Sequence, residues 1–520
     1  MRKIKTLKYL LILLPMVFAS CDDFVDVDPI GPVAENFFNT EEEYDAALIG
    51  AYDMLQSTFN SLSVVVPAAD DFGAGGDRNS IDQAVLQNVN LLIHTENDEG
   101  QLRDVWRFMY GGLSRVNYLL ANKDKLEFDG KDEMLAEAYF LRAYYTFELV
   151  KFFGNIPLEV EERGGVLRMA DSQISSEEQF TVERTESISQ VYGLIQEDLK
   201  EAIPNLPLTQ DLPYEVTRGA AQALLGKAYL YNGDFSDAAI VLNQVITSNQ
   251  YSLVTGDDYA NLFELVGENG PESVFEIQFT NVEGAGWDCI QCSEGNYFVQ
   301  YNGPRKLDDP VFDTGWGFMI PSQALYDAFD DDDMRRDLTI FDLREVKALD
   351  DADLYDAVRE DTGLYNRKWI PRKADKAGNQ NTRELTHQTN YRAIRYADVL
   401  LMAAEAEAKS SGPNAEDYLN LVRERAYGNR SNNYSSTEGT LVDAIFNERR
   451  KELAGEGHRF FDLVRTGRAD AAFDAYNASK PSDFEVIDFK VNKHEVFPIP
   501  LIELELALAE ERWGQNQGYN

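Results

Sequence analysis

The sequence predicts a mainly α fold: a scaffold of paired helices, interrupted by a long loop-rich insertion that carries a few short strands. Long segments place apolar residues at intervals of three and four, which is the spacing of one helix face. Residues 217–250 show the pattern of two closely packed helices. Over 251–389 the helical pattern fades, and Gly, Asn, Asp and aromatic residues dominate.

The first residues predict an export signal. Four basic residues precede an apolar run from Tyr9 to Ala19, which is shorter than the roughly 20 residues that span a membrane. The run ends in Phe18-Ala19-Ser20-Cys21, which resembles the lipobox of bacterial lipoproteins, whose cysteine is acylated. We therefore expect a signal peptide over 1–20, lipid on Cys21, an acidic extended tether over 21–35 and a single domain over 36–520. The alternative is an ordinary signal peptide with an incidental cysteine.

The scaffold helices are predicted from periodicity. The clearest early ones are Glu41–Gln56, Gln101–Leu120 and Asp132–Phe153. Within 217–250, small residues at Gly226 and Ala238 match a tetratricopeptide repeat, in which two antiparallel helices approach closely. A looser copy is predicted at Tyr391–Ser410 and Asn414–Tyr427, with neighbouring helices at Gln190–Ala202 and Gly439–Ala454.

The insertion, Tyr251 to about Thr389, contains short strand-like pieces such as Ser273–Phe279. Binding sites are usually built on irregular segments that a regular scaffold positions. Within the insertion, Cys289 and Cys292 form a CxxC pair. In an exported protein such a pair predicts a disulfide, with free thiols and a metal site as the alternatives. A zinc site needs two more ligands, and the four histidines show no paired spacing, so we expect no metal and no cofactor.

The charge balance excludes nucleic acid as a partner. The chain has 90 acidic and 48 basic residues, a net charge of −42. Proteins that bind DNA or RNA neutralise phosphates with Lys and Arg, and this surface repels phosphates instead. For the same reason an uncharged polysaccharide is easier to accommodate than an anionic one.

Several segments together resemble the SusD/RagB family of surface glycan-binding lipoproteins. They are Ser20-Cys21-Asp22-Asp23-Phe24, Ala136–Tyr144 running to Phe153-Gly154-Asn155-Ile156-Pro157-Leu158, Asn447–Arg465, Phe497-Pro498-Ile499-Pro500 and Gln515–Tyr519. The resemblance implies a helical fold of tetratricopeptide-like pairs, an outer-membrane lipid anchor, and a TonB-dependent transporter of the SusC type as partner. It also implies that the Gly-rich loop Asp70–Asn79 contributes polar ligand contacts, for which we select Asp71, Arg78 and Asn79.

Sugars present flat apolar faces and rims of hydroxyls, so a binding site needs exposed aromatic rings beside hydrogen-bonding groups. The candidates in the insertion are Trp287, Tyr297, Tyr301 and Trp316. Each of them could instead pack in the interior. Trp106 and Trp369 are assigned to packing, and the charged series from Arg449 to Arg465 is interpreted as structural ion pairs rather than as catalytic groups.

The leading hypothesis is a non-catalytic, cell-surface binder of an oligosaccharide or polysaccharide, such as a neutral glucan, that delivers its ligand to the transporter. Two other functions stay open. A glycoside hydrolase needs two suitably spaced carboxylates, and a chain this acidic provides many such pairs by chance. The other is a repeat scaffold that binds only proteins of an outer-membrane complex.

Overall fold

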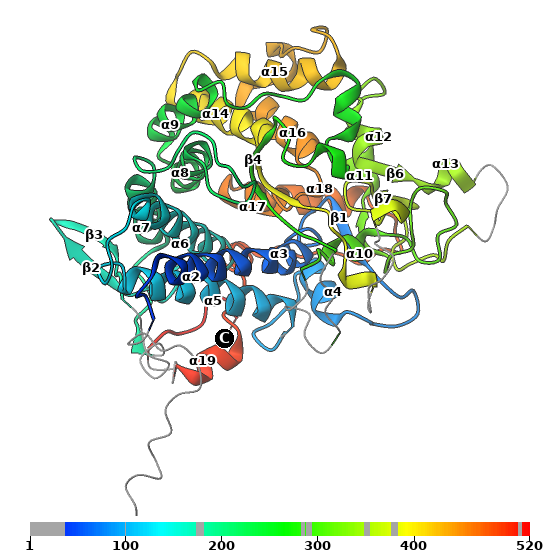
Figure 1. Ribbon diagram of the computed structural model, residues 1–520. Helices are drawn as coiled ribbons and strands as arrows, with labels where there is room; N and C mark the ends of the chain where they lie inside the picture. Colours follow the sequence, from blue (N-terminus) through cyan, green and yellow to red (C-terminus); the bar gives the residue numbers. More distant parts are fainter. Residues whose placement is uncertain are drawn as a thin grey trace, which may run out of the picture.

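A computed structural model describes residues 37–98, 100–172, 181–281, 287, 294–347, 354–375, 383–507 and 512–519. Figure 1 shows long helices stacked on one side of the molecule, and the short helices and strands of the insertion gathered on the other. The described residues contain no helix that is both long enough and apolar enough to cross a membrane.

The helices are α2 (Glu41–Asp53), α3 (Thr58–Val65), α4 (Ala84–Asn90), α5 (Gln101–Ala121), α6 (Lys131–Phe153), α7 (Ile188–Ala202), α8 (Arg218–Asn232), α9 (Phe235–Thr247), α10 (Phe298–Asn302), α11 (Gln323–Tyr326), α12 (Arg335–Thr339), α13 (Leu343–Lys347), α14 (Tyr396–Ser410), α15 (Ala415–Tyr427), α16 (Leu441–Glu452), α17 (Arg459–Arg465), α18 (Ala469–Ser479) and α19 (Leu501–Leu506). From α5 to α9 each helix packs against the next, α9 packs against α14, and α14 packs against α15 and α16. The predicted mainly helical, tetratricopeptide-like architecture is confirmed.

Among the described residues the strands occur in four antiparallel pairs: β1 (Phe72–Gly75) with β5 (Phe318–Pro321), β2 (Val160–Arg163) with β3 (Val166–Met169), β4 (Ser273–Ile277) with β8 (Tyr391–Arg395), and β6 (Ile340–Asp342) with β7 (Leu364–Asn366). The β4 strand confirms the strand expected at Ser273–Phe279. The prediction of a helix from Tyr391 was wrong over five residues, because 391–395 pair with β4 and the helix begins at Tyr396. Pairing partners distant in sequence override local periodicity there.

The pair α8 and α9 shows why the repeat pattern needs a small residue at 226. A Cβ atom added to Gly226 would lie only 2.4 Å from Cγ of Leu242 on the facing helix. Any larger side chain would push the two helices apart. The predicted close approach is therefore confirmed, and the turn between the helices is made by Gly233, whose φ of 87° favours glycine.

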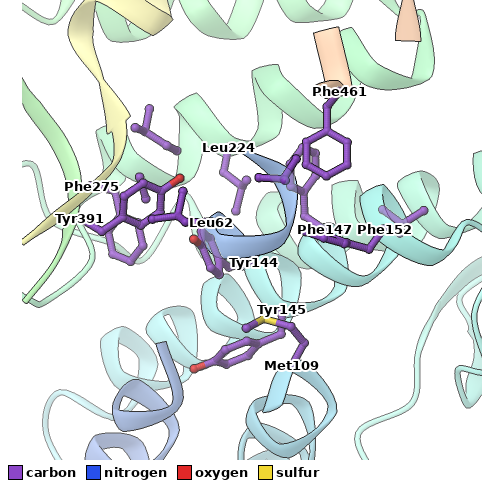
Figure 2. Packing of buried hydrophobic residues seen from close by; sticks show 14 of the residues in the cluster. Leu62, Met109, Tyr144, Tyr145, Phe147, Phe152, Leu224, Phe275, Tyr391 and Phe461 are labelled. Carbon is purple, nitrogen blue, oxygen red and sulfur yellow. The ribbon is translucent and has the colours of Figure 1, made fainter. Parts of the chain in front are cut away.

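Helix α6 forms the centre of the core. Figure 2 shows its side chains reaching neighbours on several sides, with Tyr144 toward Phe275 of β4 and Phe152 toward Phe461 of α17. The ring centroids of these pairs are 5.7 Å and 5.2 Å apart. Because α6 is buried nearly along its whole length, it joins the helical scaffold to the insertion and to the C-terminal helices.

A buried network of charges also ties the insertion to the scaffold. Arg395, at the end of β8, lies 2.6 Å from Glu272, 3.1 Å from Glu452 and 2.8 Å from Glu456. Arg425 of α15 contacts both Glu272 and Glu452, at 3.1 Å and 2.6 Å. Burial opposes ionisation of Glu452, but Arg425 and Arg395 hold its pKa well below its usual range. Four more buried charged residues extend the network: Lys368, Arg335, Glu448 and Asp333.

A second part of the network confirms the structural interpretation of the charged series. Arg449 of α16 contacts Asp398 of α14 at 2.7 Å and Asp462 of α17 at 2.9 Å, and Arg465 contacts Glu405 at 2.7 Å. These charges pair across helices in the interior. Each therefore has its partner inside the protein, as buried charges require.

Candidate functional site

The four aromatic residues selected from the sequence form one cluster. Trp316 lies at its centre, with ring centroids 5.0 Å from Tyr301, 5.8 Å from Trp287 and 6.3 Å from Tyr297. The Tyr301 ring stands nearly perpendicular to Trp316, at 87°, whereas the planes of the two tryptophans differ by 35°. We call these four residues the aromatic platform.

Exposure divides the platform into an outer and an inner pair. Trp287 is 54% exposed and Trp316 is half-buried, whereas Tyr297 and Tyr301 are buried. The Tyr301 hydroxyl accepts a hydrogen bond of 3.0 Å from Gln101, and burial raises its pKa to about 12. The outer pair is therefore available for stacking on a ligand, and the inner pair supports it from below.

The backbone around Trp316 is fixed by local packing. Its N–H donates to the carbonyl oxygen of Gln300 at 2.8 Å, and its own carbonyl oxygen accepts from Nε of Arg305 at 2.7 Å. Gly315 lies so close to Gly303 that a Cβ at position 315 would be 2.3 Å from the Cα of Gly303. Only glycine fits at this contact, so the turn that presents Trp316 depends on it.

The pairing of β1 with β5 brings the Gly-rich loop beside the platform. Gly75 pairs with Phe318, two residues after Trp316, and the N–H of Gly76 donates to the carbonyl oxygen of Gly317 at 2.8 Å. The next residues, Asp77, Arg78 and Asn79, extend from this point.

Arg305 joins this loop to the platform. Besides Trp316, its guanidinium group contacts Asp82, and it lies 3.6 Å from Asp77. Because its planar fork holds the loop and the Trp316 backbone together, we assign Arg305 a positioning role. Arg305 was not among the residues predicted from the sequence. In the sequence, the Gly-Trp-Gly run at 315–317 predicts the turn that Arg305 holds, but it does not indicate which residue binds there.

The predicted polar residues lie in different surroundings. Arg78 and Asn79 are exposed, and Arg78 lines a hollow of about 360 Å³ together with residues 357–361 and 483–485. Asp71 is fully buried and pairs with Arg450 at 2.5 Å, while the adjacent Asp70 pairs with Arg459 at 2.8 Å. These ion pairs anchor the base of the loop to the scaffold, and a buried carboxylate cannot reach a ligand. We therefore leave Asp71 out of the proposed binding surface.

The remaining predicted features lie outside the described residues. They are Cys21, Cys289 and Cys292, so lipidation and the disulfide stay predictions. In the part of the chain that the structure describes, no group of three or more His, Cys, Asp or Glu side chains could hold a metal ion. Trp106 and Trp369 are buried, which confirms their assignment to packing.

A separate hollow of about 370 Å³ lies along α5, near Trp106, Tyr110, Met169 and Trp513. It contains none of the residues predicted to bind ligand. The arrangement that matches sugar recognition is the aromatic platform with its adjoining loop.

Two family models match the chain. The model described as "SusD family" matches residues 347–519, and the one described as "Starch-binding associating with outer membrane" matches residues 23–230. A curated relative, SusD-like protein P2 of Formosa agariphila, is 29% identical over 96% of this chain and 97% of its own length.

Solved structures match nearly the whole described fold. A laminarin binding SusD-like protein is 33% identical, with a TM-score of 0.79 over 92% of this chain and 100% of that one. Surface glycan-binding protein A from Bacteroides fluxus is 28% identical, with a TM-score of 0.79 over 92% and 100% of the two chains. The corresponding protein from Bacteroides thetaiotaomicron, solved in complex with laminarihexaose, is 25% identical, with a TM-score of 0.77 over 92% and 99%. The chain belongs to the SusD family.

Proposed function

We propose that the protein binds a neutral glycan at the cell surface, without cleaving it, through the outer face of the aromatic platform. The observation that carries the proposal is the exposed Trp287 and half-buried Trp316 above two buried tyrosines, beside a loop that presents Arg78 and Asn79. Rings of this kind stack on the apolar face of a sugar, and the loop side chains reach its hydroxyls. The backbone of Trp316 is fixed by its hydrogen bonds to Gln300 and Arg305, so little conformational entropy of this residue is lost on binding.

Laminarin-type glucan is the proposed ligand. One similar structure is named for laminarin binding and another was solved with laminarihexaose. The charge of −42 supports a neutral rather than an anionic polysaccharide, since like charges would repel.

Isothermal titration of the purified protein against laminarin, amylose and alginate tests the proposal. We expect binding to laminarin and none to alginate. Binding to alginate alone, or to none of the three, refutes it. Incubation with laminarin followed by a reducing-sugar assay tests the non-catalytic part, because release of reducing ends would identify a hydrolase.

We further propose that Cys21 carries lipid that holds the protein on the outer membrane, and that a TonB-dependent transporter receives the glycan. The lipobox-like residues before Cys21 support the anchor, and the description of the matching N-terminal model, which includes residue 23, supports the location. Cys21→Ala should move the protein from the membrane to the soluble fraction, provided that the transporter is deleted. A mutant that stays in the outer-membrane fraction contradicts the anchor. Co-purification of a transporter barrel with the wild-type protein from detergent extract, identified by mass spectrometry, tests the partner.

A further inference from the structure

A groove lies beside the Gly-rich loop, where this loop meets the backbone that follows Trp316. Its walls are residues 357–361 and 483–485, with Arg78 at its edge, and it encloses about 360 Å³. The two wall segments are more than 100 residues apart in the sequence. Nothing in the local pattern of either segment predicts a groove, and only the fold brings them together.

Close contacts join the segment that carries Trp316 to one wall of this groove. The N–H of Gly76 donates to the carbonyl oxygen of Gly317, next to Trp316, at 2.8 Å, and the N–H of Arg359 donates to the carbonyl oxygen of Gly76 at 3.2 Å. A Cβ atom added to Gly317 would lie 2.5 Å from Cγ1 of Val358, so the same wall also packs directly against the residue that follows Trp316. These contacts place the groove beside the backbone that carries Trp316, so it is a neighbouring surface for a glycan that extends beyond the platform.

The groove combines an aromatic ring with polar groups of both signs. Phe484 is half-buried, and Asp483 and Arg78 are exposed. In the described residues neither Asp483 nor Arg78 has an ion-pair partner. Phe484 can stack on a sugar face, while the carboxylate accepts from hydroxyls and the guanidinium group donates to them.

The other charged side chains of the groove are already engaged. Arg359 pairs with Glu485, and Glu360 accepts a hydrogen bond of 2.7 Å from the N–H of Glu485. The hydroxyl of Tyr355 donates to Asp361 at 2.9 Å. These contacts hold the walls in place. The groove is lined by four carboxylates and two arginines, so its net charge is negative. The groove therefore suits an uncharged, hydroxyl-rich ligand and disfavours a polyanion.

We propose that this groove is a second subsite, in which Phe484, Asp483 and Arg78 hold further sugar units of the same neutral glycan chain that rests on the platform. The proposal rests on the proposed function. An oligosaccharide long enough to occupy both subsites of the protein binds more tightly than a short one. Once the platform holds one end, binding of the other end to the groove is an intramolecular step.

Isothermal titration with laminaritriose and laminarihexaose tests the inference. The wild type should bind the hexaose at least tenfold more tightly than the triose. Phe484→Ala should weaken hexaose binding about fivefold or more and leave triose binding unchanged, whereas Trp316→Ala should weaken both. Val486→Ala is the matched control, since Val486 is 68% exposed on the same loop and does not line the groove.

Asp483→Ala provides a second variant if Phe484→Ala unfolds early, because Asp483 is exposed. It too should weaken binding of the hexaose only. If both groove variants bind hexaose like the wild type while Trp316→Ala is impaired, the second subsite is refuted and the proposed function stands. An equal loss for both sugars also refutes the subsite. Failure of the wild type to bind either sugar refutes both proposals.

Discussion

Replacing each platform tryptophan by alanine should separate binding from stability. Trp287 is 54% exposed and, among the described rings, contacts only Trp316, so Trp287→Ala should lower the free energy of unfolding by about 1 kcal/mol or less. Trp316 is half-buried and contacts three rings. Truncating a fully buried Trp costs about 3–5 kcal/mol, so Trp316→Ala should cost about 2 kcal/mol.

Both variants should bind more weakly. Stacking of one ring on a flat ligand is worth about 1–3 kcal/mol, as measured for bases on aromatic side chains, which corresponds to about 5- to 150-fold in affinity. Urea denaturation gives the stabilities, and titration with laminarihexaose gives the affinities. Tyr434→Ala, in the loop between α15 and α16, is the control for loss of a partly buried aromatic ring elsewhere.

Three outcomes can be told apart. Loss of affinity in both variants, with the larger loss of stability in Trp316→Ala, supports the platform. Normal affinity in Trp287→Ala with a large loss of stability would make that residue part of the core. Wild-type affinity in both variants refutes the assignment of the platform.

The packing of the scaffold and its electrostatics give further predictions. Gly226→Ala should cost about 1–3 kcal/mol of stability in urea denaturation, because its Cβ would overlap the facing helix. Gly193→Ala, whose Cβ would meet nothing within 4 Å, should instead be neutral or stabilising by up to about 1 kcal/mol, and the same loss at both sites would contradict the packing argument. Burial raises the pKa of Glu137 to about 7. Its contribution to stability is therefore fully present below the unfolded pKa near 4.5 and is lost as the pH rises through 7. Glu137→Gln should stabilise the protein by about 3 kcal/mol at pH 8 and by little at pH 4, and an equal effect at both values would refute the shift. Cys289 and Cys292 should resist alkylation without reductant, as mass spectrometry can show, whereas two alkylated thiols would exclude the disulfide.

The sequence was most informative where local pattern and packing agree. Gly226 and the residues around it predicted the close helix pair, because a repeat motif encodes both periodicity and the size of the contact residue. The charged series from Arg449 to Arg465 was correctly interpreted as structural, because many charges alternating in sign on neighbouring helices are more often ion pairs than catalytic groups, and the partners lie on other helices. The four aromatic residues were selected because they stand in a region without helical pattern, and they do form one cluster, but Tyr297 and Tyr301 are buried in it and only Trp287 and Trp316 reach the surface.

The misses concern contacts between residues far apart in the chain. The strand at 391–395 exists because β4 pairs with it, and β4 lies more than 100 residues earlier. Asp71 looked like a loop residue, but Arg450 and Arg459, nearly 400 residues later, draw it into the interior. The groove at Phe484 depends in the same way on residues 357–361. Local propensity carries no information on such partners.

The buried charges around Arg395 have a consequence for exchanging binding loops between relatives. Removing one partner of a buried ion pair leaves an uncompensated charge and costs about 3–5 kcal/mol. Glu272, Arg395, Glu452 and Glu456 therefore have to be retained or replaced together with Arg425 and Lys368, which pair with the same carboxylates. Exchanging the aromatic and polar residues of the binding surface leaves no charge of this buried network without its partner. A chimaera that transplants the loops of another family member should therefore fold if it retains this charged junction, and ligand preference can then be redesigned independently of the scaffold.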